Sequence, residues 1–161
     1  RSPMRPAWHD SATVQNVQES QRSREMKISV SVWVARPIAD VWQGWNTPAS
    51  IMAWNAASPQ WHCPQSRVDL RVGGRFCHHM AARDGSMGFD FEGTFTEVTA
   101  PTGLGYVMDD GREVSVRFVA EQGGTRVEER FDAESLHSGE QQRAGWQSIL
   151  DNFKRHMEAA S

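Results

Sequence analysis

A series of glycine-containing turn signals constrains the fold of this chain more than any other feature. Four dipeptides suit the positive backbone φ angles of tight hairpins: Gly73-Gly74, Asp84-Gly85, Asp110-Gly111 and Gly123-Gly124. Pro101-Thr102-Gly103 supplies a further reversal. Strands joined by such short connections pair antiparallel. The sequence therefore predicts about six consecutive antiparallel strands, which end near Ala133.

One more strand and two short helices are expected before this meander. Residues 27–35 alternate apolar and other side chains, as in a half-buried strand. Pro37 then suits the first turn of a helix, whose apolar face carries Ile38, Val41, Trp42 and Trp45. Thr47-Pro48 repeats the pattern, with the threonine hydroxyl expected to cap a second short helix. An irregular loop through Pro59 and Pro64 should follow.

The chain is expected to close with a long amphipathic helix. Ser138 and Gln141 have the spacing of a capping box. An apolar stripe follows: Trp146, Ile149, Leu150, Phe153 and Met157. These elements share one core if the curved sheet wraps the last helix. The predicted fold is thus α+β and helix-grip: a curved antiparallel sheet of about seven strands around a long C-terminal helix, with two short helices after the first strand.

Length and composition limit the domain organisation and the partners. A chain of 161 residues suits a single domain, which we place at residues 26–161. Residues 1–25 are rich in polar side chains and are expected to be a mobile extension; a short extra helix before Met26 is the alternative. The net charge of -3 disfavours nucleic acid as a partner. We expect a monomer or a homodimer.

The chain also lacks the signals of membrane insertion and export. No apolar run approaches the roughly 18 residues that span a bilayer, and no basic-then-apolar signal peptide is present. The two cysteines are consistent with a reducing compartment. A cytoplasmic location is the expectation.

Strand alternation selects the side chains that would line the interior. Seven tryptophans and seven phenylalanines accompany a single tyrosine, a bias that suits a dry interior. An empty volume of roughly 300 Å³ would cost about 7 kcal/mol, close to the whole stability of a domain, so a large cavity should have a function. The alternative is that these residues fill a solid core. The candidate ligand-binding residues are Trp54, Phe76, His78, Met80, Phe89, Phe91, Phe95, Met108, Phe118, Glu129, Trp146, Leu150 and Phe153.

His78 and Glu129 are the polar members of this set. They would orient a polar group of the ligand, or act as acid and base in a reaction. The alternative is a hydrogen-bonded core histidine and a strand-end glutamate that reaches solvent. The sequence leaves both interpretations open.

Neither a metal site nor a known catalytic motif is expected. Histidines and cysteines do gather at His62, Cys63, Cys77, His78 and His79, but the spacing matches no established zinc site. There is no nucleophile elbow and no dinucleotide fingerprint. Gly73-Gly74 joins two strands and leads into no helix, so it predicts a turn and not a phosphate-binding loop. No cofactor is predicted.

An ordered set of motifs resembles a known family. The set is Val41-Trp42, Trp54, Asp69-Leu70-Arg71-Val72-Gly73-Gly74, Asp84-Gly85, Phe91-Glu92-Gly93, Glu97-Val98 and Gln142-Arg143-Ala144-Gly145-Trp146. It is similar to the activator of heat-shock-protein-90 ATPase homologue-like domain, a member of the START-like or polyketide-cyclase superfamily that includes the birch-pollen allergen. This resemblance implies a deep cavity between the sheet and the last helix, used for small apolar molecules.

The family resemblance does not imply one activity, because the fold serves several. The first hypothesis is a non-enzymatic carrier or sensor of a small hydrophobic ligand. The alternatives are a cyclase-like enzyme that uses His78 or Glu129, and a co-chaperone that regulates a heat-shock-protein-90-like ATPase. The third is weaker because true activators carry a separate N-terminal chaperone-binding domain, for which some 25 residues are too few.

Overall fold

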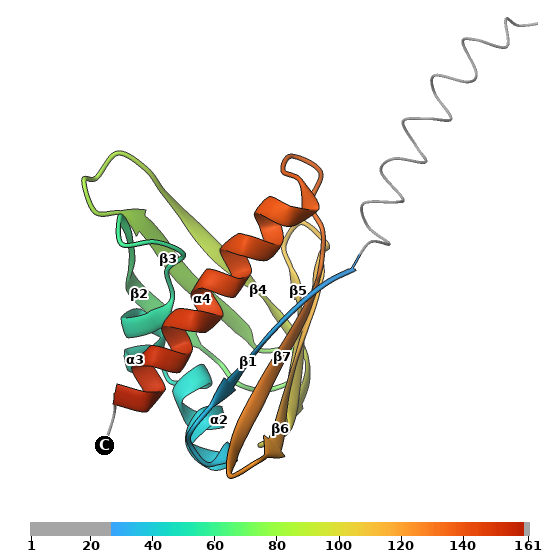
Figure 1. Ribbon diagram of the computed structural model, residues 1–161. Helices are drawn as coiled ribbons and strands as arrows, with labels where there is room; N and C mark the ends of the chain where they lie inside the picture. Colours follow the sequence, from blue (N-terminus) through green and yellow to red (C-terminus); the bar gives the residue numbers. More distant parts are fainter. Residues whose placement is uncertain (1–26, 160–161) are drawn as a thin grey trace, which may run out of the picture.

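The structure is a computed structural model that describes residues 27–159 (Figure 1). The extension expected at residues 1–25 lies outside the described residues. The elements follow in the order β1 (Lys27–Val34), α2 (Ile38–Asn46), α3 (Pro48–Trp54), β2 (Trp61–Val68), β3 (Arg75–Ala82), β4 (Gly88–Thr99), β5 (Gly103–Met108), β6 (Glu113–Glu121), β7 (Gly124–Asp132) and α4 (Gly139–Ala159).

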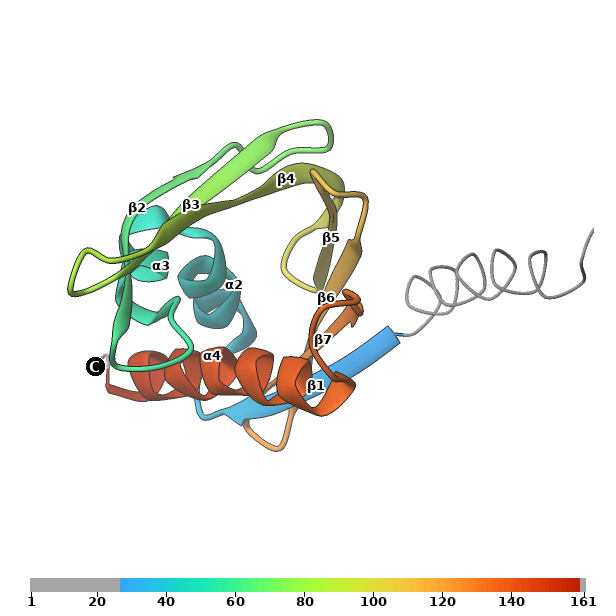
Figure 2. The ribbon, with the colours of Figure 1, turned by 90° about the horizontal axis from the view of Figure 1, so that it is seen from above.

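The predicted helix-grip fold is confirmed. Seven strands form one sheet in the order β1-β7-β6-β5-β4-β3-β2, and every neighbouring pair is antiparallel. Seen from above, the sheet curls around α2 and α3, and α4 runs along its open side (Figure 2). The strands, helices and turns therefore enclose one interior between the concave face of the sheet and α4.

The Gly73-Gly74 pair forms the turn between β2 and β3. Gly73 has a φ of 85°, a conformation that glycine adopts without strain. The amide of Gly73 donates to the carbonyl of Phe95 at 2.8 Å, and the amide of Phe95 donates to the carbonyl of Gly74 at 2.9 Å. The turn is thus also bonded to β4, which confirms it as a strand connection and not a phosphate-binding loop.

The expected loop through Pro59 and Pro64 is partly wrong, because β2 already begins at Trp61 and contains Pro64. The strand is at the edge of the sheet and pairs with β3 alone. Its register shifts between His62 and Gln65. An edge strand with such an irregularity accommodates a proline, which has no amide hydrogen to donate.

The two expected helix caps have different outcomes. At α4, the Ser138 amide donates to Gln141 Oε1 at 3.0 Å and the Gln141 amide donates to Ser138 Oγ at 3.1 Å, so the capping box is confirmed. At α3, the Thr47 hydroxyl makes no cap but donates backwards to the Gln43 carbonyl at 2.6 Å. The hydroxyl bonds the last turn of α2, because the two helices adjoin at this residue.

Candidate functional site

A cavity of about 280 Å³ lies between the concave face of the sheet and the helices. This is close to the lower end of the volumes of small-molecule sites, roughly 300 Å³. Every helix and strand except β1 and β6 contributes residues to its wall, and the turn between β5 and β6 contributes one more. The lining residues are Trp45, Asn46, Ile51, Trp54, Asn55, Val68, Phe76, His78, Met80, Phe89, Phe91, Phe95, Leu104, Tyr106, Arg112, Glu129, Trp146 and Ile149.

The structure places most of the predicted site residues in this wall. They are Trp54, Phe76, His78, Met80, Phe89, Phe91, Phe95, Glu129 and Trp146. The remaining four, Met108, Phe118, Leu150 and Phe153, are buried but do not border the cavity. Their side chains point into the interior, as predicted. They lie in the part of the interior that other side chains fill.

A cluster of aromatic rings explains why that part of the interior is solid. The Phe153 ring of α4 meets both Trp45 and Trp54 edge-on, with ring centroids 5.0 Å apart in each case. The Phe118 ring of β6 lies 5.9 Å from Trp45 and 5.6 Å from Trp42. Rings at these distances fill the space around Phe118 and Phe153, whereas Trp45 and Trp54 also border the hollow.

A second aromatic cluster forms the wall of the hollow. Phe76 is at its centre, with ring centroids 4.7 Å from Tyr106, 5.3 Å from Phe95 and 5.9 Å from Phe91. Trp146 of α4 stacks on Phe131 of β7 at 3.8 Å and meets the Phe91 ring edge-on at 6.2 Å. Flat rings therefore face the hollow from both the sheet and the helix.

Phe89 differs from the other aromatic lining residues because 53% of its surface is exposed. It lies at the start of β4, with its ring 5.9 Å from that of Trp61. A side chain that both borders the cavity and meets solvent marks the mouth.

His78 projects from β3 into the cavity wall. Its Nδ1 atom is 2.9 Å from the Ser66 hydroxyl, and its ring lies beside those of Phe76 and Phe91. Burial lowers the pKa of His78 to about 4, so the imidazole is neutral at pH 7. This agrees with the hydrogen-bonded interpretation of His78, which nevertheless borders the cavity.

Glu129 lies on β7 and is 5% exposed. In the sheet register it stands opposite Val30 and Val116, and it makes no hydrogen bond or ion pair with the other described residues. Burial raises its pKa to about 8. The interpretation of Glu129 as a strand-end residue that reaches solvent is therefore wrong.

Tyr106 is the other enclosed polar residue of the wall, with 8% exposure. Burial raises its pKa well above the usual value, and the nearby Glu129 carboxylate raises it further. The charge of Arg112, in the turn before β6, lowers the pKa of Tyr106. Arg112 also lines the cavity. Tyr106 alternates with the buried Leu104 and Met108 on β5, so strand alternation accounts for its inward position, but no periodicity signals Arg112, because it lies in a turn.

Residues 35–158 match the model of the family described as Activator of Hsp90 ATPase homolog 1-like protein. The chain belongs to this family. It is thereby a member of the START-like superfamily, as its motifs indicated. None of the curated proteins compared with it matches.

Solved structures support this assignment. An AHSA1-like protein from Aeromonas hydrophila is 64% identical, with a TM-score of 0.79 over 84% of this chain and 94% of that one. A protein from Cytophaga hutchinsonii is 44% identical, with a TM-score of 0.73 over 83% of this chain and 92% of that one. A protein from Nitrosomonas europaea, 23% identical, has a TM-score of 0.74 over 84% and 96% of the two chains and shows the shared fold.

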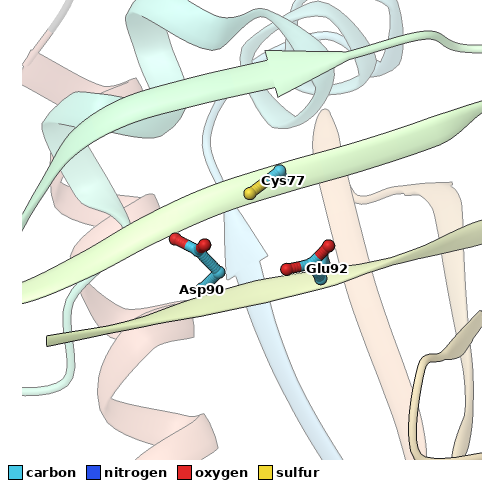
Figure 3. A group of neighbouring side chains, drawn as sticks. All are labelled: Cys77, Asp90 and Glu92. Carbon is cyan, nitrogen blue, oxygen red and sulfur yellow. The ribbon is translucent and has the colours of Figure 1, made fainter.

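Three potential metal ligands come together on β3 and β4: Cys77, Asp90 and Glu92 (Figure 3). Their candidate ligand atoms lie within 4.8 Å of one another. However, Asp90 is paired with His79 at 2.7 Å, and Glu92 with Arg75 at 3.1 Å. Burial raises the pKa of the Cys77 thiol, which favours its protonated form. These partners identify a cluster of paired side chains that also includes Arg75 and His79, whereas Cys63 is separately buried and its thiol donates to the carbonyl of Gln65.

Within residues 27–159, no helix has the length and apolar character required to cross a bilayer.

Proposed function

We propose that this protein binds a small, largely apolar molecule in the cavity between the sheet and α4. The observation that carries the proposal is the hollow itself. An empty volume of 280 Å³ would cost about 7 kcal/mol at about 24 cal/mol/Å³, comparable with the total stability of a domain. A bound molecule would offset this cost by restoring contacts to the lining side chains.

The lining indicates the class of molecule. Tryptophan, phenylalanine and tyrosine rings make up much of the wall, and polar groups are few. Such a wall suits a flat hydrocarbon body with limited polar decoration. The partly exposed Phe89 would let a ligand enter beside the β3–β4 turn.

Fluorescence of N-phenyl-1-naphthylamine tests the proposal, because this neutral probe brightens in dry apolar sites. We expect the natural chain to bind it and Val68→Trp to bind it at least about tenfold more weakly. Val68 borders the cavity, so a larger side chain there occupies ligand volume.

Val72→Trp is the matched control, since Val72 is exposed in the β2–β3 turn and does not line the cavity. It should leave probe binding unchanged. Equal binding by the natural chain and Val68→Trp, or no binding by the natural chain, would contradict the proposal.

A further inference from the structure

Two polar groups in the cavity wall lack the partners that buried polar groups normally have. Glu129 and Tyr106 are 5% and 8% exposed, and neither side chain forms a hydrogen bond with another described residue. Their neighbours across the sheet offer no hydrogen-bonding side chain; they are Val30, Phe95, Val114 and Val116. Leaving such groups unpaired is costly, about 1–3 kcal/mol each in general.

The oxygens of these two side chains keep some accessible surface, and both residues line the cavity. Among the described residues, the fully enclosed side-chain polar atoms without a hydrogen bond belong to Arg126 and Asp132. Glu129 and Tyr106 are not in that class, and both line the hollow. The two are also close enough for the Glu129 charge to act on the Tyr106 hydroxyl. A ligand can therefore reach both groups from inside the cavity.

The chemistry around them favours a hydrogen-bond acceptor on the ligand over a cation. The Arg112 guanidinium lines the same cavity and interacts electrostatically with Tyr106, so its positive charge disfavours an ammonium group there. Arg112 is itself bonded through Nε to Asp110 at 2.8 Å. The apolar surroundings favour a neutral carboxylic acid at Glu129, which like the tyrosine hydroxyl donates a hydrogen bond.

We propose that the ligand of this cavity is a neutral ring compound with a carbonyl-type oxygen, and that this oxygen accepts hydrogen bonds from Glu129 and Tyr106. The inference rests on the proposed ligand-binding function and specifies the ligand class. The aromatic wall holds the ring body of the ligand, and the side-chain oxygens of Glu129 and Tyr106 orient it. The carbonyl satisfies donors that the fold leaves unpaired, which gives it an advantage over a hydrocarbon of the same shape.

A matched set of ligands tests this assignment. Fluorene, 9-fluorenone and 9-aminofluorene share one ring body and differ at a single position: a methylene, a carbonyl or an amine that is protonated at pH 6.5. Each is titrated at pH 6.5 against protein loaded with N-phenyl-1-naphthylamine. We expect fluorenone to displace the probe at a concentration about tenfold or more below that of fluorene, with the amine weaker than both.

Variants then assign the preference to the two residues. Glu129→Leu and Tyr106→Phe should each reduce the advantage of fluorenone over fluorene to less than about threefold, because the carbonyl then loses a hydrogen bond that fluorene never makes. Glu129→Gln keeps a hydrogen-bond donor and should retain the preference. Circular dichroism and probe binding verify that each variant is folded with an open cavity.

The outcomes separate this inference from the proposed function. Equal displacement by fluorene and fluorenone, a preference for the amine, or a carbonyl preference that survives both Glu129→Leu and Tyr106→Phe would each overturn the inference, while probe binding upholds the cavity as a ligand site. Failure of the probe to bind the natural chain would remove the proposed function and this inference with it.

Discussion

At the scale of single residues, His78 and Glu129 share one cavity but respond to burial in opposite directions. Desolvation disfavours the charged form of each. For the histidine this lowers the pKa to about 4, and for the glutamate it raises the pKa to about 8. Both side chains are therefore neutral in the folded protein around pH 6. Each makes the stability depend on pH, and the two dependences have opposite directions.

The sign of each contribution follows from the proton balance. Between pH 4.5 and 8 the unfolded chain has lost the Glu129 proton that the folded chain keeps, so stability is lost as pH rises through this window. Between pH 6.5 and 4 the unfolded chain has gained a His78 proton that the folded chain lacks, so stability is lost as pH falls.

Glu129→Gln and His78→Gln should reveal these two effects with opposite slopes. Relative to the natural chain, Glu129→Gln should gain up to roughly 5 kcal/mol of unfolding free energy between pH 4.5 and pH 8. His78→Gln should gain up to roughly 3 kcal/mol between pH 6.5 and pH 4. Urea unfolding at pH 4, 4.5, 6.5 and 8 measures both, and slopes of the same sign would contradict the assignment.

At the scale of elements, the cavity wall depends on close approach between β4, β5 and the ring of Phe76. Gly93 of β4 pairs with Phe76 on one side and Met108 on the other. A Cβ atom at Gly93 would overlap the backbone carbonyl of Val107 and come within 3.1 Å of the Phe76 ring. The glycine lets the Phe76 ring approach the backbone of β4 closely.

Gly93→Ala should therefore destabilise the protein by about 1–3 kcal/mol, because a backbone carbonyl cannot move aside as a flexible side chain can. Gly105→Ala in the neighbouring strand is the matched control. A Cβ atom at Gly105 meets its nearest neighbour, the Thr96 hydroxyl, at 3.4 Å, which is near ordinary contact. Thermal unfolding should place Gly105→Ala within about 1 kcal/mol of the natural chain; equal losses in the two variants would refute the steric explanation.

At the scale of the whole molecule, α4 is anchored mainly on one side. It packs on β1, α2 and α3, whereas towards β3, β4 and β5 it borders the cavity, with the Trp146 ring meeting that of Phe91 of β4 at 6.2 Å. A bound molecule would add contacts between α4 and these strands. Binding should therefore lower the frequency of local opening in α4.

Hydrogen exchange of backbone amides measures that opening. With N-phenyl-1-naphthylamine at saturation, amides of α4 and β3–β4 should exchange more slowly, and those of β6, which contributes no lining residue, should change least. Val68→Trp, with its cavity partly filled, should show little response to the probe. Uniform slowing across all strands would argue against a ligand that bridges α4 and the sheet.

Much of this molecule could be predicted from the sequence because its signals are local. Turn glycines need positive φ angles, alternation sets the face of each strand, and an apolar stripe identifies the C-terminal helix. Most of the inward-facing residues on β3 and β4 do border the cavity. Pro64 was misleading, because a proline inside a strand is compatible only with an edge position that the sequence does not reveal.

The sequence by itself determined the fold and the inner face of each strand, while only the tertiary structure decided where the interior is hollow. Four residues follow the same strand alternation or helical stripe as the lining residues, yet they pack in the filled part of the interior: Met108, Phe118, Leu150 and Phe153. Arg112 borders the hollow from a turn, and Glu129 is enclosed without a partner. The reason is physical: periodicity fixes which way a side chain points, but the position of a void depends on sheet curvature and on helix placement, which distant residues set together.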